Sequence, residues 1–332
     1  LDIVSGAFWY QGPDFRRKHP VGRLEPCDDY YDDFSTIPMD INGDGYLDFV
    51  TGGWWGNTIR WRENPREAGK EWPEHIIAEC GNVETTRAWD VDGDGQLEIV
   101  PNTPGHPLVA YKLILDAQGR GTGRFKAHVI RQEPQGHGLG FGDINGDGRG
   151  DFVLCNGWLE APADPLRGEW QFHPDFDLGC ASIPILVVDV NGDGLNDLIV
   201  GQAHGYGLDW LEQRLDAAGN RTWVRHTIDA ANSQYHDLMW VDLDGDGRCE
   251  LLTGKRYRAH GDHDPGSFDP VGIYYFQWTG ESFLKQVIDW GPARVGKGCG
   301  IHMAVADLDG NGRLDIVAPG KDGLYVFYNQ GR

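Results

Sequence analysis

The 332-residue chain contains no run of 18 apolar residues, so the sequence predicts no helical membrane span. It also lacks any block of Lys and Arg, and its 51 acidic against 29 basic residues give a formal net charge of −22. A surface of this sign repels a phosphate backbone, so we expect no nucleic-acid partner. The first residues contain no basic segment followed by an apolar core, so no signal peptide is visible, and we expect further residues upstream of Leu1.

Several catalytic motifs are also missing. There is no G-x-S-x-G nucleophile elbow, no G-x-x-x-x-G-K-[ST] phosphate loop and no H-E-x-x-H zinc motif. The six cysteines show no CxxC pair and no zinc-finger spacing, and we interpret them as buried free thiols. They are Cys27, Cys80, Cys155, Cys180, Cys249 and Cys299.

One acidic pattern, D-x-[DN]-G-[DN]-G-x-x-[DE], occurs six times along the chain. Side-chain oxygens stand at positions 1, 3, 5 and 9, a backbone carbonyl can reach in from position 7, and glycines at 4 and 6 permit a tight turn. Hard oxygen ligands at this spacing suit Ca²⁺, with Mg²⁺ as the alternative. The predicted ligands are Asp40, Asn42, Asp44, Asp48, Asp90, Asp92, Asp94, Glu98, Asp143, Asn145, Asp147, Asp151, Asp189, Asn191, Asp193, Asp197, Asp242, Asp244, Asp246, Glu250, Asp307, Asp309, Asn311 and Asp315.

The loops are not EF-hands. An EF-hand needs Glu at position 12 and continues into a helix, whereas position 12 is never acidic here and the loops run into strand-like segments such as "DFV" and "DLIV". A second aromatic-rich strand and then an aromatic-x-x-His pattern follow most loops. We interpret the histidines of that pattern as structural; they are His75, His128, His173 and His226. A unit of four short strands about every 50 residues is typical of a propeller blade.

The loop followed by an apolar strand resembles the FG-GAP/VCBS repeat of integrin-type β-propellers. The resemblance covers the whole chain and implies an all-β fold: one seven-bladed β-propeller domain over residues 1–332, with four-stranded antiparallel blades and structural calcium in several loops. The segment "LDIVSG" at the start matches the tail of another loop. We therefore expect the first blade to lack its first strand and the last blade to lack its fourth.

In the resembled fold, each acidic loop joins strands one and two of a blade. The start of strand one and the loop between strands two and three then lie on the opposite face, around the axis. His137 and His236 stand six residues before an acidic loop, and His302 stands five before one. Loops between strands two and three would add His106, His204, His260 and His263. Together with Glu84 or Asp237, these imidazoles could bind Zn²⁺ or another divalent transition metal, or act as acid and base without metal. Alternatively, they are polar residues that line a wet channel.

Four stretches, among them "GHGLGFGDINGDG" and "GKRYRAH", resemble the propeller domain of aldos-2-ulose dehydratase and its bacterial relatives. This resemblance implies a metal-assisted elimination of water from a keto-sugar. If the departing oxygen belongs to a glycosidic bond, the same site would be a glycoside lyase, so we expect a carbon–oxygen lyase acting on a keto-sugar or glycoside. The cupin-like domains of that family are absent, so a later isomerisation is not expected. The candidate ligands and bases are His137, His236 and His302, with Arg87, Lys255 and Tyr257 as electrostatic and proton-transfer partners. The candidate substrate-binding residues are His204, His260, Trp158 and Arg256.

Two other functions remain open at this point. The chain could be a non-catalytic propeller that binds carbohydrate or protein, for which a face of aromatic and amide residues would be typical. It could also be a polysaccharide lyase, which would need a basic groove for uronates. Repeats of this kind favour a periplasmic or extracellular location.

Overall fold

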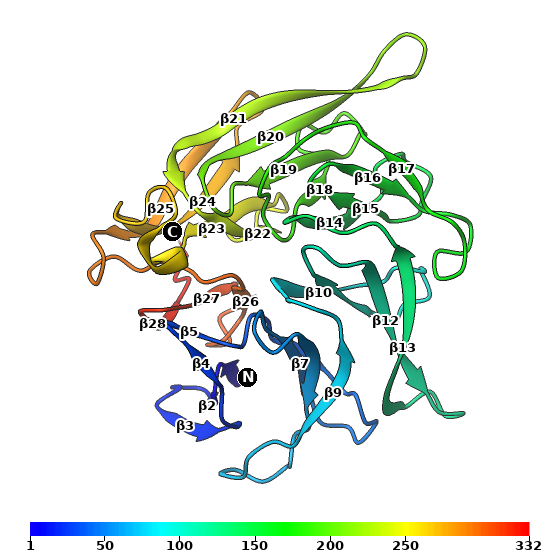
Figure 1. The fold of residues 1–332 in the computed structure, drawn as a ribbon. Coiled ribbons are helices and arrows are strands. Elements are labelled where there is room, and N and C mark those ends of the chain that lie inside the picture. Colours follow the sequence, from blue (N-terminus) through cyan, green and yellow to red (C-terminus); the bar gives the residue numbers. More distant parts are fainter. Residues whose placement is uncertain (332) are drawn as a thin grey trace. The chain divides into compact units, whose positions relative to one another are not determined.

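The computed structural model describes residues 1–331, which form β-strands and one short 3₁₀ helix, η1 (Ala259–Asp262). Consecutive strands pair antiparallel in every sheet (Figure 1). The chain divides into two compact units, Leu1–Gln135 with Asp164–Gly168, and Gly136–Ala163 with the residues from Glu169 onward. No helix among residues 1–331 combines the length and hydropathy that a membrane span requires.

The first unit contains a three-stranded sheet, two four-stranded sheets and a two-stranded ribbon. The three-stranded sheet consists of β1 (Ile3–Ser5), β2 (Phe8–Gln11) and β3 (Arg17–Pro20), and the ribbon of β4 (Pro26–Cys27) and β5 (Tyr30–Tyr31). The four-stranded sheets are β6 (Ile37–Met39), β7 (Asp48–Gly52), β8 (Thr58–Arg62) and β9 (Glu74–Glu79), then β10 (Thr85–Trp89), β11 (Glu98–Asn102), β12 (Leu108–Leu115) and β13 (Gly121–Arg131).

The second unit contains three four-stranded sheets and one three-stranded sheet. The first two are β14 (Leu139–Gly142), β15 (Asp151–Leu154), β16 (Gly157–Glu160) and β17 (Gln171–His173), then β18 (Leu186–Val188), β19 (Asp197–Gly201), β20 (Tyr206–Leu215) and β21 (Arg221–Ser233). The others are β22 (Tyr235–Val241), β23 (Glu250–Lys255), β24 (Val271–Trp278) and β25 (Phe283–Gly291), then β26 (Ala304–Ala306), β27 (Asp315–Gly320) and β28 (Gly323–Phe327).

The predicted fold class is confirmed: the chain is all-β, with the seven antiparallel sheets of a seven-bladed β-propeller. Five sheets have four strands. The first and last sheets have three, as the repeat pattern predicted. Each acidic loop joins the first and second strands of its sheet, as the loop between β14 and β15 illustrates.

The acidic loops also tie their sheets together through position 9. Asp151 is completely buried, and its carboxylate accepts the backbone N–H of Ile144 and of Ala161, both at 2.9 Å. The bond from Ile144 closes the loop, and the bond from Ala161 connects the loop to the end of the third strand, β16. Gly146 and Gly148, at positions 4 and 6, have φ of +77° and +86°, a left-handed conformation that favours glycine. The repeated glycines therefore reflect backbone geometry, independently of any metal.

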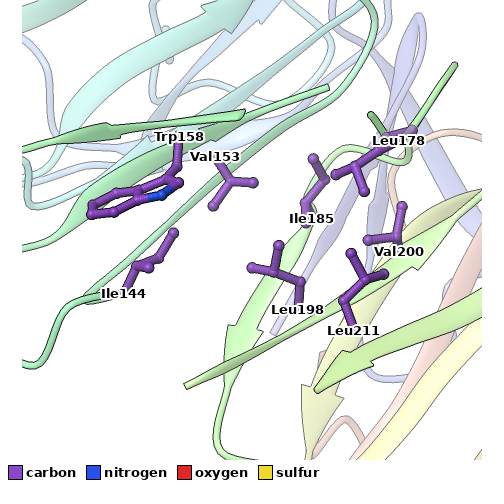
Figure 2. Packing of buried hydrophobic residues seen from close by; sticks show 9 residues of the cluster. Ile144, Val153, Trp158, Leu178, Ile185, Leu198, Val200 and Leu211 are labelled. Carbon is purple, nitrogen blue, oxygen red and sulfur yellow. The ribbon is translucent and has the colours of Figure 1, made fainter. Parts of the chain in front are cut away.

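Apolar residues from neighbouring sheets make the core. In the second unit, Ile144, Val153 and Trp158 from one sheet region pack in a single cluster with Leu198 and Leu211 from the next (Figure 2). Burial of such side chains contributes roughly 1.5–3 kcal/mol each. The cluster fixes the spacing of the two sheets whose ends carry the histidines described below.

The aromatic-x-x-His histidines support this core from the outer strand. The His173 ring stacks on Trp158 with ring centroids 4.2 Å apart, and its Nε2 lies 2.9 Å from Glu160. The same trio recurs as Trp61, His75 and Glu63, and as Trp210, His226 and Glu212. These contacts agree with the structural role expected for these residues.

All six cysteines are free thiols. The expectation that they are buried is met only by Cys299, whereas Cys180 is exposed and the other four are half-buried. Burial raises the pKa of the Cys299 thiol to about 12, so it is unreactive at neutral pH.

Candidate functional site

Three histidines from three different sheets of the second unit converge on one point. His137 precedes β14, His204 lies in the turn between β19 and β20, and His236 is on β22. One ring nitrogen of each lies within 4.8 Å of the others. The His137 ring is perpendicular to the His204 ring, with centroids 4.6 Å apart, and its centroid lies 5.1 Å from that of His236. The repeat predicted that these residues lie on one face, but it could not predict that these three, 67 and 32 positions apart, meet without His302.

Two of these imidazoles are oriented by acceptors on their Nδ1 side. His137 Nδ1 donates to the carbonyl oxygen of Ala181 at 2.8 Å. His204 Nδ1 donates to the carboxylate of Asp264 at 2.8 Å. A carbonyl or carboxylate oxygen only accepts, so the neutral form of each imidazole has its lone pair on Nε2.

The two Nε2 atoms lie 3.0 Å apart. Two lone pairs cannot face each other at this distance unless a cation lies between them, either a proton or a metal ion. Nδ1–H held by a carbonyl or carboxylate, with Nε2 directed inward, is also the usual arrangement of metal-ligating histidines. Two imidazole nitrogens that share one tetrahedral zinc ion lie about 3.3 Å apart. The three histidines therefore fit a transition-metal ion of the kind that imidazole prefers.

Asp264 orients a second imidazole as well. Its other carboxylate oxygen accepts His260 Nδ1 at 2.9 Å, and the His260 ring stacks on His204 with centroids 4.4 Å apart and planes 10° apart. The Asp264 backbone oxygen accepts the Ser267 hydroxyl at 2.7 Å. Asp264 was missed by the sequence analysis, although the spacing H260-x-x-x-D264 was a signal for it.

A buried polar chain supports this loop from β23. Ser267 accepts Gln234 Nε2 at 3.2 Å, and Gln234 Oε1 accepts the Lys255 ammonium at 3.1 Å. Lys255 is completely buried, and desolvation lowers its pKa to about 8. Burial keeps this ammonium from direct contact with a substrate in this structure. Its geometry suits it to positioning the loop, rather than the proton transfer predicted for it.

Arg256 and Tyr257 follow at the start of the same loop. Arg256 is 7% exposed, and its Nη1 has no hydrogen-bond partner within residues 1–331. A buried guanidinium N–H without an acceptor is costly, and an oxygen of a bound ligand would satisfy it. Tyr257 is half-buried.

Four other predicted residues are not part of this cluster. Trp158 is 1% exposed and belongs to the core cluster, so the prediction that it offers a face to substrate is wrong for this structure. His302 is half-buried and is in neither of the histidine groups formed by described residues. Asp237, a candidate ligand, accepts the backbone N–H of Met303 at 2.5 Å. Arg87 is on β10, in the first unit.

The acidic loops offer only oxygen ligands, which fit Ca²⁺. In the loop of residues 242–250, for example, carboxylate oxygens of Asp242, Asp244 and Asp246 lie within 4.8 Å of one another. The carboxylate oxygens of Asp90, Asp92 and Asp94 lie equally close together, but in that loop the Lys112 ammonium contacts Asp92 and Asp94.

Comparisons with known proteins agree with the repeat. Residues 40–100 and 189–253 match the family model described as FG-GAP-like repeat. Among solved structures, a biofilm matrix protein of V. cholerae is similar at 20% identity and a TM-score of 0.39, over 82% of this chain and 41% of its own. A functionally unknown protein from Desulfotomaculum acetoxidans is similar at 15% identity and a TM-score of 0.48, over 98% of this chain and 89% of its own. No curated protein matches the chain.

Proposed function

The chain carries FG-GAP-like repeats on a seven-bladed β-propeller fold, and we propose that this fold is the scaffold of a carbon–oxygen lyase. Its substrate is a keto-sugar or a glycoside, and its reaction is a β-elimination at the histidine cluster of the second unit. The observation that carries the proposal is the 3.0 Å approach of His137 Nε2 to His204 Nε2, which requires a cation.

His137, His204 and His236 are the residues that would hold a divalent transition metal. When bound, such an ion supplies a Lewis acid that polarises a carbonyl oxygen. The three converging imidazoles favour an enzyme over a purely adhesive surface, because they contribute little to sugar stacking.

The elimination breaks the C–H bond α to a carbonyl and the C–O bond β to it, and it forms a C=C bond. His260 accepts the α proton at Nε2, since Asp264 holds the Nδ1–H and stabilises the imidazolium that forms. Tyr257 gives its proton to the departing oxygen, which leaves as water or as a sugar hydroxyl. The proton taken up by His260 returns to Tyr257 through solvent, so the enzyme is regenerated.

Substrate recognition is assigned to Arg256 and to the exposed edge of the same loop. The Arg256 Nη1 donor would bind a carbonyl or carboxylate oxygen, for which the guanidinium geometry is suited. Aromatic surface comes from Tyr206, which is 47% exposed, and from Phe268, which is 85% exposed. The Tyr206 hydroxyl donates to the carboxylate of Asp269 at 2.5 Å.

The test is turnover by the purified chain after chelation and reloading with Zn²⁺, Mn²⁺ or Mg²⁺. A conjugated C=C–C=O product from 1,5-anhydrofructose or a 3-keto-glycoside would appear as new ultraviolet absorbance. We expect turnover only with a metal bound at the histidine cluster. Bound metal without elimination from any keto-sugar or glycoside would overturn the proposal.

The second candidate is sugar binding without turnover. The exposed Tyr206 and Phe268 favour it, because aromatic faces stack on sugar rings. Saturable binding of the same sugars with no chemical change, unaffected by His137→Gln, would support it over the lyase.

A further inference from the structure

One acidic loop of the first unit already contains a cation of the chain's own. Lys112, on β12, places its Nζ 2.6 Å and 2.9 Å from the two oxygens of Asp92 and 2.6 Å from Asp94. It also lies 3.2 Å from Glu98. These are positions 3, 5 and 9 of the loop, so the ammonium contacts three of the four side chains expected to bind calcium.

Within residues 1–331, this loop also lacks a hydrogen bond that the other five loops share. In the other five loops, the position-3 oxygen accepts the N–H of position 5, as Asn145 accepts from Asp147 at 3.0 Å. Among the described hydrogen bonds, Asp92 does not accept the Asp94 N–H; both its oxygens contact Lys112 instead. The position-3 ligand is therefore turned toward the ammonium.

The other sheets place no cation at the position of Lys112. Ile99 is the first residue after the acidic loop, and it pairs with Tyr111 on the next strand. Lys112 is the residue that follows Tyr111. In each of the other five sheets, we identified the residue that pairs with the first residue after the acidic loop and took the residue that follows it. The residues equivalent to Lys112 are Glu63, Glu160, Glu212, Gln277 and Tyr328. In three of them the residue adds a carboxylate beside the loop.

The arginines near two other loops do not imitate this arrangement. Arg66 contacts Asp44, and Arg149 contacts Asp147, in both cases only at position 5 and from the exposed side. Lys112 is 18% exposed and reaches the completely buried Glu98.

We propose that the loop of residues 90–98 binds no calcium, because the Lys112 ammonium is its resident cation. A metal ion and an ammonium cannot share the same carboxylate oxygens, since their repulsion at such distances is large. The first unit thus has one sheet whose loop is held without metal, and the chain binds five calcium ions rather than six.

The experiment counts bound calcium in the full chain, stripped with chelator and titrated with Ca²⁺, by native mass spectrometry and calorimetry. We expect five equivalents for the wild type and six for Lys112→Met, which removes the charge and keeps the length of the side chain. The matched control, Arg66→Met, should leave the count at five.

A second variant tests the loop without disturbing Lys112. Asp92→Ala removes the position-3 side-chain oxygen from the loop, and the count of five should be unchanged. A wild-type count of six, a Lys112→Met count equal to that of the wild type, or a loss of one equivalent in Asp92→Ala would overturn the inference.

Discussion

His137 Nε2 lies 3.0 Å from His204 Nε2, and each imidazole has its other nitrogen committed to an oxygen acceptor. The pair cannot be two neutral imidazoles with no cation between them, because their lone pairs would repel. A proton at this point makes an acid–base pair, and a metal ion makes a Lewis-acid centre.

Replacing His137 by Gln should remove one ligand and the cation that the pair shares. We expect Zn²⁺ bound to the histidine cluster to fall below detection and turnover to be lost, while the melting temperature changes little because His137 is not a core residue. Metal content by plasma mass spectrometry and thermal unfolding check this. His263→Gln is the control, since His263 is exposed in the same loop region. Full metal content in His137→Gln would contradict the assignment.

Asp264→Asn should weaken metal binding without removing a ligand. An amide can still accept from one imidazole, but it loses the charge that holds both His204 and His260. Loss of such an outer partner typically costs about 10–100-fold in metal affinity. The dissociation constant for Zn²⁺, measured by competition with a chelating dye, checks this. We also expect the pH profile of turnover to change shape, because His260 loses the partner of its imidazolium. A purely structural role would lower the melting temperature and leave both quantities unchanged.

Lys255 should make stability depend on pH in the alkaline range. Its folded-state pKa of about 8 lies below the ordinary lysine value, so between these values the unfolded chain binds more protons. The free energy of unfolding should therefore rise as pH increases from about 8 toward 10. Lys255→Met should lose this contribution, and the difference between the two proteins, from urea unfolding at several pH values, isolates it from other groups. A difference that is flat with pH would show that Lys255 titrates normally.

Trp158→Ala should destabilise the second unit rather than affect substrate binding directly. The side chain is buried, stacks on His173 and donates its indole N–H to Asp175 at 2.9 Å. Truncation of a large buried aromatic residue costs about 3–5 kcal/mol. Denaturant unfolding measures this loss. A stable Trp158→Ala protein with weakened sugar binding would restore the original prediction for this residue.

Removal of calcium should lower the melting temperature. The acidic loops bring carboxylates together, as at Asp242, Asp244 and Asp246, and without a cation these groups repel. Calorimetric scans in chelator and in Ca²⁺ check the effect, and Asp246→Asn should reduce the shift between them. The Asp94→Asn variant should not reduce it, because Lys112 serves that loop. Identical scans with and without Ca²⁺ would contradict a structural role for the ion.

The amino-acid sequence by itself determined the fold and the acidic loops. Both depend on local patterns: glycines at positions that need positive φ, short apolar strands, and an acidic residue at position 9 of each loop. Such features recur with each acidic loop, so the sequence displays them six times. The sequence also placed His137, His204, His236 and His260 among the candidates, because the repeat indicates which end of a strand each residue occupies.

Only the tertiary structure decided which candidates meet. The approach of His137 to His204 depends on how two sheets pack through their core, and Asp264 joins them because the loop after β23 folds back onto the β19–β20 turn. The same packing buries Trp158. The position of Lys112 likewise depends on strand pairing: Tyr111 opposite Ile99 brings the next residue onto the acidic loop. No spacing along the chain records these contacts, since they arise between residues that the sequence keeps far apart.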